Sequence, residues 1–262
     1  MSLSDVFATA KAESRAALVG YLPAGFPTVE GSKDYLKSMI DAGCDLVEVG
    51  LPFSDPVIDG PTIQAAAEQA LSAGFRVRDL FDVVSAVTDA GGRAVVMTYW
   101  NPVLKYGVDA FARDLASAGG LGLITPDLVP DEADDWMAAS EAHGLDRIFL
   151  VAPSSTEERV AMTARASSGF LYATAVMGVT GARDVVSSAA PELVERVREH
   201  SSIPVGVGLG VKSGAQAAEI AGFADGVIVG SAFVSAVHEG DAAVRALAAD
   251  LAKGVRSAAA IV

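Results

Sequence analysis

Two acidic residues that lie close together in the chain are the first candidates for chemistry. Glu48 lies within the apolar run Leu46–Gly50, and Asp59 lies in the Pro- and Gly-rich segment that follows. Burying an ionised carboxylate is costly, so an acid inside an apolar strand needs either partners or a chemical task. A second acid near the end of that strand predicts a general acid/base pair. Asp55, in the same segment, is interpreted as a turn or interface residue.

Both acids belong to a regular alternation of short aliphatic runs and longer alanine-rich segments with helical spacing. The runs predicted to be strands are Ala17–Leu22, Leu46–Gly50, Ala94–Tyr99, Gly122–Thr125, Arg147–Val151, Phe170–Val176, Pro204–Gly208 and Gly226–Val229. The segments predicted to be helices are Gly31–Ala42, Thr62–Ala73, Val77–Ala90, Val108–Ala118, Asp131–His143, Thr156–Ala166, Pro191–His200, Ser213–Gly222, Ser231–Val237 and Asp241–Ala260.

Eight strand–helix units predict an α/β fold, a (β/α)8 TIM barrel formed by residues 1–262 as a single domain. A doubly wound open sheet is the alternative, and it is less favoured because no GxGxxG motif follows the first strand. In a barrel, chemistry takes place at the carboxyl ends of the strands, and Val, Ile and Leu fill the interior. A catalytic role for Glu48 is therefore favoured over a carboxylate held by backbone amides. Asp59 by itself could be a residue that caps a turn, but its pairing with Glu48 favours a catalytic role for Asp59 as well.

Composition excludes several classes of function. The net charge of −14 argues against a nucleic-acid or anionic-membrane surface, because either would need a basic patch. The single cysteine, Cys44, excludes an internal disulfide and a cysteine-cluster metal site. The first residues do not form a signal peptide, and no apolar run is long enough to span a membrane. A soluble, cytoplasmic protein is expected.

Glycines after the last two predicted strands form a second candidate site. The seventh strand ends in Gly206-Val207-Gly208-Leu209-Gly210, and Gly230-Ser231 follows the eighth and opens a predicted helix. Barrels commonly hold a phosphate at these two exits, through backbone N–H groups and a helix N-terminus. Tight turns are the alternative explanation for the glycines. Phosphate binding is the favoured interpretation, and the acidic net charge does not oppose contacts made by local dipoles.

Other chemistries lack the residues that they need at the strand ends. The three histidines, His143, His200 and His238, lie in or at the ends of predicted helices, so neither a histidine metal site nor a Ser–His dyad is supported. No lysine lies within a predicted strand, which disfavours a Schiff-base aldolase. Tyr172, in an alternating apolar strand, is equally well explained as a core residue. What remains is proton transfer by carboxylates on a small phosphorylated substrate, without a metal.

The segment Pro52–Pro56, together with Asp59–Thr62, resembles the signature of the tryptophan synthase alpha chain family, in which a glutamate likewise lies just upstream. Gly178–Gly181 resembles the mobile loop that follows the sixth strand in that family, and the glycines described above resemble its phosphate cradle. The resemblance covers essentially the whole chain. It implies a lyase that cleaves indole-3-glycerol phosphate to indole and glyceraldehyde 3-phosphate by a retro-aldol reaction.

The resemblance also implies a role for each matching residue. Glu48 is the implied general acid/base at C3 of the indole ring and at the substrate hydroxyl, and Asp59 the implied acceptor of the indole N–H. Thr180 is implied to reach Asp59 when the loop closes. The residues implied to contact the substrate are Phe26, Tyr99 and Tyr172 at the indole ring, Gly181, Gly208, Gly230 and Ser231 at the phosphate, and Thr180 on the loop.

The same resemblance implies a partner: a beta chain that uses pyridoxal phosphate, in an alpha2-beta2 heterotetramer, while this chain carries no cofactor. Asn101-Pro102 and Asp55-Pro56 match interface positions of the family. Ala175–Met177 and Ala182-Arg183 depart from its usual loop sequence, which concerns loop closure and not the reaction. Three alternatives remain open: a lyase that acts without a partner, another phosphate-binding barrel such as a phosphosugar isomerase, and a non-catalytic allosteric subunit. The intact pair of acids argues against the last.

Overall fold

The computed structural model describes residues 2–174, 189–208 and 210–257. At its centre is a sheet of nine strands, all paired in parallel, in the order β5-β4-β3-β2-β1-β9-β8-β7-β6. The strands are β1 (Ala17–Pro23), β2 (Leu46–Gly50), β3 (Ala94–Met97), β4 (Gly122–Ile124), β5 (Asp146–Ile148), β6 (Leu150–Val151), β7 (Leu171–Thr174), β8 (Val205–Gly208) and β9 (Gly226–Val229).

The two ends of this sheet, β5 and β6, are consecutive pieces of the same chain segment. β5 pairs with β4, and β6 pairs with β7, so the change of partner falls at Phe149. The N–H of Thr125 still bonds to Ile148 O (3.3 Å), whereas the N–H of Tyr172 bonds to Phe149 O (3.1 Å). The sheet therefore closes into a barrel. The predicted barrel is confirmed, with its fifth strand divided in two.

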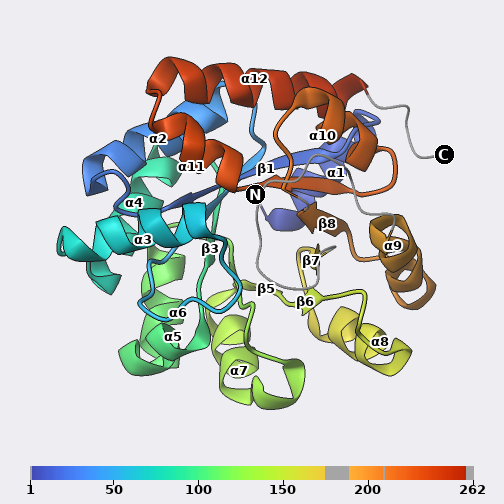
Figure 1. Cartoon of the computed structure of the whole chain (residues 1–262). Coiled ribbons are helices and arrows are strands. Elements are labelled where there is room, and N and C mark those ends of the chain that lie inside the picture. Colours follow the sequence, from blue (N-terminus) through green and yellow to red (C-terminus); the bar gives the residue numbers. More distant parts are fainter. Residues whose placement is uncertain (1, 175–188, 209, 258–262) are drawn as a thin grey trace.

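Helices form the outer layer around the strands (Figure 1). They are α1 (Leu3–Ala12), α2 (Val29–Asp41), α3 (Pro61–Ser72), α4 (Val77–Asp89), α5 (Trp100–Tyr106), α6 (Val108–Ser117), α7 (Asp134–His143), α8 (Glu157–Ala166), α9 (Ala189–His200), α10 (Gly214–Ala221), α11 (Ser231–Val237) and α12 (Asp241–Ser257), with a 3-10 turn η1 (Pro130–Glu132). Thr156 caps the start of α8, because its hydroxyl accepts from the N–H of Arg159 at 3.3 Å.

Two helices differ from the sequence prediction. α1 was not predicted, although Ser2 and Asp5 form a capping box at its start. It closes the amino end of the barrel, where Phe7 packs on Phe170 with ring centroids 5.2 Å apart. α5 was predicted as a loop after a strand that reached Tyr99. Instead β3 ends at Met97, and the helix that follows starts where Asp127 Oδ1 accepts from the N–H of Trp100 at 2.9 Å.

The barrel interior is built in layers that follow the alternation of the strands. A buried apolar layer near the amino ends of the strands contains Val19, Leu46, Val95, Ile148, Phe170 and Ile228, with α1 beneath it. The residue two positions further along each strand faces the same way. Those next residues are Tyr21, Glu48, Met97, Leu150, Tyr172 and Gly230, and they form the floor and walls of a pocket.

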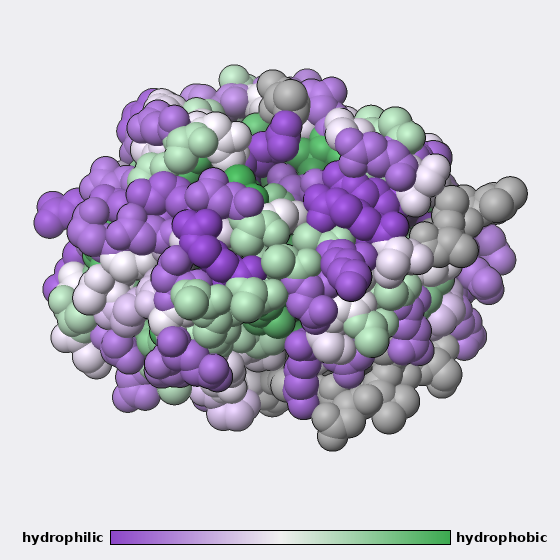
Figure 2. Space-filling view, turned by 90° about the horizontal axis from the view of Figure 1, so that it is seen from above, coloured by the Kyte–Doolittle hydropathy of each residue, from purple (hydrophilic) through white to green (hydrophobic). Residues whose placement is uncertain are grey.

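One face of the surface is mostly hydrophilic (Figure 2). On the face formed by α12 and α2, seen from above in Figure 2, hydrophilic residues predominate, and apolar residues show mainly near the middle of the view. Among the described residues, no helix is both long and apolar enough to cross a membrane.

Candidate active site

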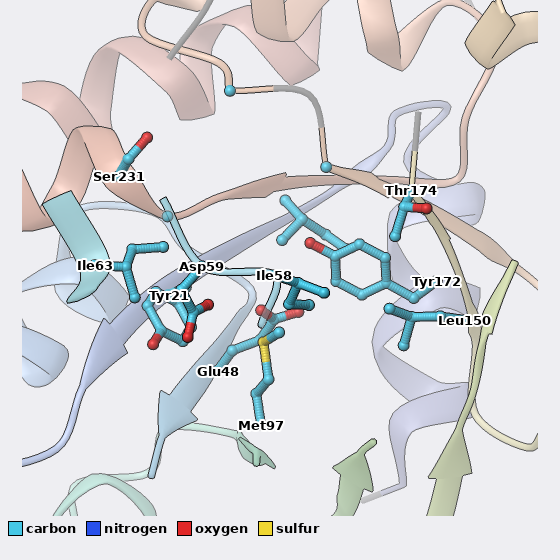
Figure 3. Close-up of a pocket in the computed structure, with 14 residues that line it drawn as sticks. Tyr21, Glu48, Ile58, Asp59, Ile63, Met97, Leu150, Tyr172, Thr174 and Ser231 are labelled. Carbon is cyan, nitrogen blue, oxygen red and sulfur yellow. The ribbon is translucent and has the colours of Figure 1, made fainter. Parts of the chain in front are cut away.

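The pocket opens at the carboxyl ends of the strands and contains both predicted acids (Figure 3). Its empty space, including the open mouth, is about 770 Å³. It is lined by Tyr21, Glu48, Ile58, Asp59, Ile63, Met97, Leu150, Tyr172, Thr174, Gly208, Gly210, Ile228, Gly230 and Ser231. Apolar and aromatic groups predominate, and none of the described lining residues is a lysine or an arginine. Such a pocket suits a flat apolar group that carries a few polar atoms.

Glu48 lies in the floor of this pocket on β2, with 1% of its surface exposed. No described group forms a hydrogen bond with its Oε1 atom. Burial alone raises the pKa of this carboxyl to about 8, so at neutral pH it holds a proton. The alternative of a carboxylate held by backbone amides does not fit this environment. A neutral carboxylic acid facing an apolar pocket is suited to donate a proton.

Asp59 lies in the segment between β2 and α3, and a tyrosine orients it. Tyr99 Oη donates a hydrogen bond to Asp59 Oδ2 at 3.0 Å and accepts from the N–H groups of Val57 and Ile58, each at 3.1 Å. Burial raises the pKa of Asp59, and the bond from Tyr99 opposes that rise. No hydrogen bond to Asp59 Oδ1 is present in the described part of the chain, so this atom can accept one from a ligand.

Two of the aromatic residues predicted to line the pocket lie elsewhere. Phe26 is 1% exposed and packs edge-on against His238, with ring centroids 5.4 Å apart. It comes after the end of β1, in the turn at Gly25, so its ring leaves the barrel interior and the prediction for Phe26 is not supported. Tyr99 is behind Asp59 and does not line the pocket. Tyr172 does line it, and Figure 3 shows its hydroxyl directed into the cavity.

Tyr21 is the aromatic residue that sequence reasoning missed. It lies opposite Glu48 in the register of β1 and β2, so both side chains face the barrel interior. The signal was present in the sequence, because Tyr21 follows Val19 by two positions in a strand. Ile58, Ile63 and Met97, also unpredicted, add apolar surface beside the acids.

The predicted glycines form the other side of the pocket. Gly208, Gly230 and Ser231 line it as expected, and Gly210 joins them with a φ of 68°. A Cβ atom at Gly208 would overlap Tyr172 Oη, so a side chain there would displace the tyrosine hydroxyl. Ser231 opens α11, whose first N–H groups have no partner within the helix. These backbone groups make this side suited to bind an anion.

Thr180 and Gly181 lie outside the described residues, as does the whole segment 175–188. Their predicted contacts with phosphate and with Asp59 therefore remain predictions.

One group of potential metal ligands occurs in the described part of the chain, and it lies outside this pocket. It consists of Glu157, Glu199 and His200, all exposed. Arg196 already bonds to Glu157 at 2.5 Å, which lowers the pKa of that carboxyl. The pocket chemistry does not involve this cluster.

A closed parallel barrel, with a buried carboxyl group at the carboxyl ends of its strands and a glycine-lined side opposite, is typical of (β/α)8-barrel enzymes that act on small molecules. The sequence model of a family described as "Tryptophan synthase alpha chain" matches residues 7–261. The chain belongs to the tryptophan synthase alpha chain family, whose members are lyases of tryptophan biosynthesis.

Comparison with individual relatives gives the same family. The tryptophan synthase alpha chain of Nocardia farcinica is 69% identical over 256 residues, which cover 98% of this chain and 96% of the relative. That of Mycobacteroides abscessus is 66% identical over 256 residues, with 98% of each chain covered. A chain in a solved structure of Mycobacterium tuberculosis tryptophan synthase is 65% identical and superposes with a TM-score of 0.94, covering 97% of this chain and 98% of that one.

Proposed function

We propose that this chain cleaves indole-3-glycerol phosphate to indole and glyceraldehyde 3-phosphate by a retro-aldol reaction, with residues 1–262 acting as one barrel domain. The observation that carries the proposal is the state of Glu48, a buried carboxyl with a pKa of about 8 beside a second acid in an apolar pocket. Indole is a poor carbanion leaving group, so C3 of its ring must be protonated before the bond breaks. A neutral Glu48 can supply that proton.

The reaction then balances without a cofactor in this chain. Glu48 protonates C3, which leaves a positive charge on the indole ring. The bond between C3 and the carbinol carbon breaks, and its electron pair neutralises the ring. The carbinol hydroxyl loses its proton as the aldehyde forms, and the Glu48 carboxylate takes that proton back. One residue thus serves as acid and then as base.

Asp59 would stabilise the charged ring. Its free Oδ1 atom can accept the indole N–H, and the interaction strengthens as positive charge develops on the ring. Tyr99 contributes indirectly, because its bond to Oδ2 fixes the orientation of this carboxylate. Asp59 must be ionised for this task, and the bond from Tyr99 opposes the rise in pKa that burial causes.

The phosphate would bind opposite the acids. Gly208, Gly230 and Ser231 line that side with backbone groups, and Gly181 is proposed to add a further N–H. Thr180 is proposed to reach Asp59 when its loop closes over the substrate.

We further propose that the chain works in the cytoplasm with a tryptophan synthase beta chain, in an alpha2-beta2 heterotetramer in which the beta chain holds pyridoxal phosphate. Three large apolar side chains are exposed at the carboxyl end of the barrel: Val57 (68%), Leu104 (57%) and Val129 (43%). They follow β2, β3 and β4, which are neighbours in the sheet. Exposed apolar groups on segments that follow adjacent strands fit a protein contact.

The test is the release of indole from indole-3-glycerol phosphate by the purified chain, with and without an added beta chain. Weak release that rises sharply with the beta chain would support the coupled synthase. Strong release by the chain alone would indicate a lyase that acts without a partner. No release under either condition would refute the proposal and redirect attention to other phosphate substrates, such as phosphosugars. Substrate binding without any release would indicate a non-catalytic subunit.

A further inference from the structure

Tyr21 occupies the position between the acidic and the anion-binding sides of the pocket. Its strand, β1, pairs with β2, which carries Glu48, on one side and with β9 on the other. In register, Tyr21 is opposite Glu48, and its neighbour Gly20 is opposite Val229. Tyr21 therefore lies alongside Gly230, the residue that follows β9. Figure 3 shows its ring beside the Asp59 side chain.

Two glycines leave room for the Tyr21 ring. A Cβ atom at Gly230 would lie 3.3 Å from Tyr21 Cδ1, near the base of the ring. A Cβ atom at Gly50 would lie 2.6 Å from Tyr21 Cζ and would overlap the hydroxyl. The side chain thus extends from Gly230 on the anion-binding side toward Gly50 at the end of β2. Its hydroxyl is at the end nearer the strand of Glu48.

This hydroxyl has no hydrogen-bond partner within the described residues, although only 8% of Tyr21 is exposed. Tyr99 and Tyr106 differ, because their hydroxyls are bonded to Asp59 and Asp114. Burial, together with the nearby charges of Asp59 and Glu48, raises the pKa of Tyr21 well above its ordinary value. The group therefore remains an O–H donor at neutral pH. Because Tyr21 lines the pocket, this unpaired O–H is available to donate a hydrogen bond to a ligand there.

We propose that Tyr21 is a substrate-positioning residue whose hydroxyl donates a hydrogen bond to the carbinol oxygen of the substrate, on the carbon next to the indole ring. This inference rests on the proposed function. A ligand with its phosphate at Gly230 and its ring at the acids must run its three-carbon chain along Tyr21. The bond would hold the carbinol group at Glu48 and persist as that oxygen becomes the aldehyde carbonyl.

The test compares two ligands in a protein that binds the substrate but has lost its proton donor. In the Glu48→Gln background, the dissociation constants of indole-3-glycerol phosphate and of 3-(indol-3-yl)propyl phosphate are measured with Tyr21 intact and with Tyr21→Phe. The second ligand has the same ring and phosphate but lacks the hydroxyl groups. Tyr21→Phe is expected to raise the dissociation constant of indole-3-glycerol phosphate about fivefold, which corresponds to the loss of one neutral hydrogen bond. The dissociation constant of 3-(indol-3-yl)propyl phosphate should change by no more than about twofold.

An equal effect on both ligands would mean that Tyr21 only packs against them and would overturn the inference, as would no effect on either. Tyr106→Phe is the matched control, because it removes a tyrosine hydroxyl that is bonded to Asp114 outside the pocket, and it should change neither constant. Indole release by the unmodified chain separates the two proposals. If release occurs and the ligands respond alike to Tyr21→Phe, only this inference fails; if no release occurs with the beta chain present, both fail.

Discussion

Tyr99 Oη and Asp59 Oδ2 lie 3.0 Å apart, and the same hydroxyl accepts the N–H groups of Val57 and Ile58. One phenol therefore orients the second acid of the site and fastens the loop that carries it to α5. Because Tyr99 does not line the pocket, its effect on chemistry must pass through Asp59.

Removing the Tyr99 hydroxyl should lower activity without changing the residues that line the pocket. Tyr99→Phe is expected to lower kcat/KM about tenfold, since the bond that is lost goes to a charged group. The pKa of Asp59 should rise further, so the acidic limb of the kcat/KM profile should move to higher pH. A pH–rate profile checks both effects. Tyr106→Phe serves as the control, and a profile of unchanged shape in Tyr99→Phe would contradict the orienting role.

Glu48→Gln keeps the shape of the side chain and removes the transferable proton. Turnover is expected to fall about a hundredfold or more, while substrate affinity stays within a few-fold. Steady-state kinetics and direct binding measurements separate the two. Undiminished turnover would refute the assignment of Glu48 as the acid.

The buried acid should also make stability depend on pH. The pKa of Glu48 is raised from 4.5 to about 8, so between these values the unfolded chain releases a proton that the folded chain keeps. The stabilising contribution of the protonated form is complete below pH 4.5 and is lost as the pH rises through about 8. Between pH 4.5 and about 8, the free energy of unfolding of Glu48→Gln should therefore rise relative to that of the wild type by up to a few kcal/mol. Denaturant unfolding at several pH values measures this difference. A constant difference across this pH range would show that Glu48 ionises freely.

A side chain at Gly208 is expected to displace Tyr172, because a Cβ atom would overlap the tyrosine hydroxyl. Gly208→Ala should raise KM for the phosphorylated substrate by displacing Tyr172 or the strand end. Adding Tyr172→Phe removes the overlapping oxygen and should recover part of the loss. A double-mutant cycle measures this coupling, and strictly additive effects would show that the two positions act independently.

Leu104 tests the proposed partner surface away from the acids. Leu104→Asp places a charge on the exposed side chain of α5 and should weaken stimulation by the beta chain about tenfold or more, without altering the activity of the isolated chain. Titration of activity with beta chain measures this. Leu104→Ala should have a smaller effect, and full stimulation of the Asp variant would remove Leu104 from the interface.

The strands and the two acids could be predicted because local rules determine them. β-branched runs between Gly and Pro indicate strands, and Glu48 stands out because it is an acid among aliphatic residues. Phe26 could not be placed, since the turn at Gly25 that directs its ring has no clear signature in a single sequence. Tyr21 could have been predicted from its alternation with Val19, but its position beside Asp59 depends on how β1 and β2 pair.

Two features of the fold could not be predicted from the sequence either: the division between β5 and β6, and the position of α1. Whether Phe149 interrupts a strand depends on how a closed sheet shares its last hydrogen bonds, a property of the whole barrel. α1 has a capping box and an apolar face, yet its place beneath Phe170 follows only once a barrel with an open amino end exists.

α1 also determines from which end of the barrel a ligand can reach the pocket. With Leu3 and Phe7 of α1 packed into one end, the described chain leaves the opposite mouth, above Glu48, as the route into the pocket. In the described chain, a ligand would therefore enter and leave on the same side, past the segment that carries Ile58 and Asp59. Val57 is exposed next to Ile58 and Asp59, which line the pocket, so a partner bound at Val57 would lie beside this route.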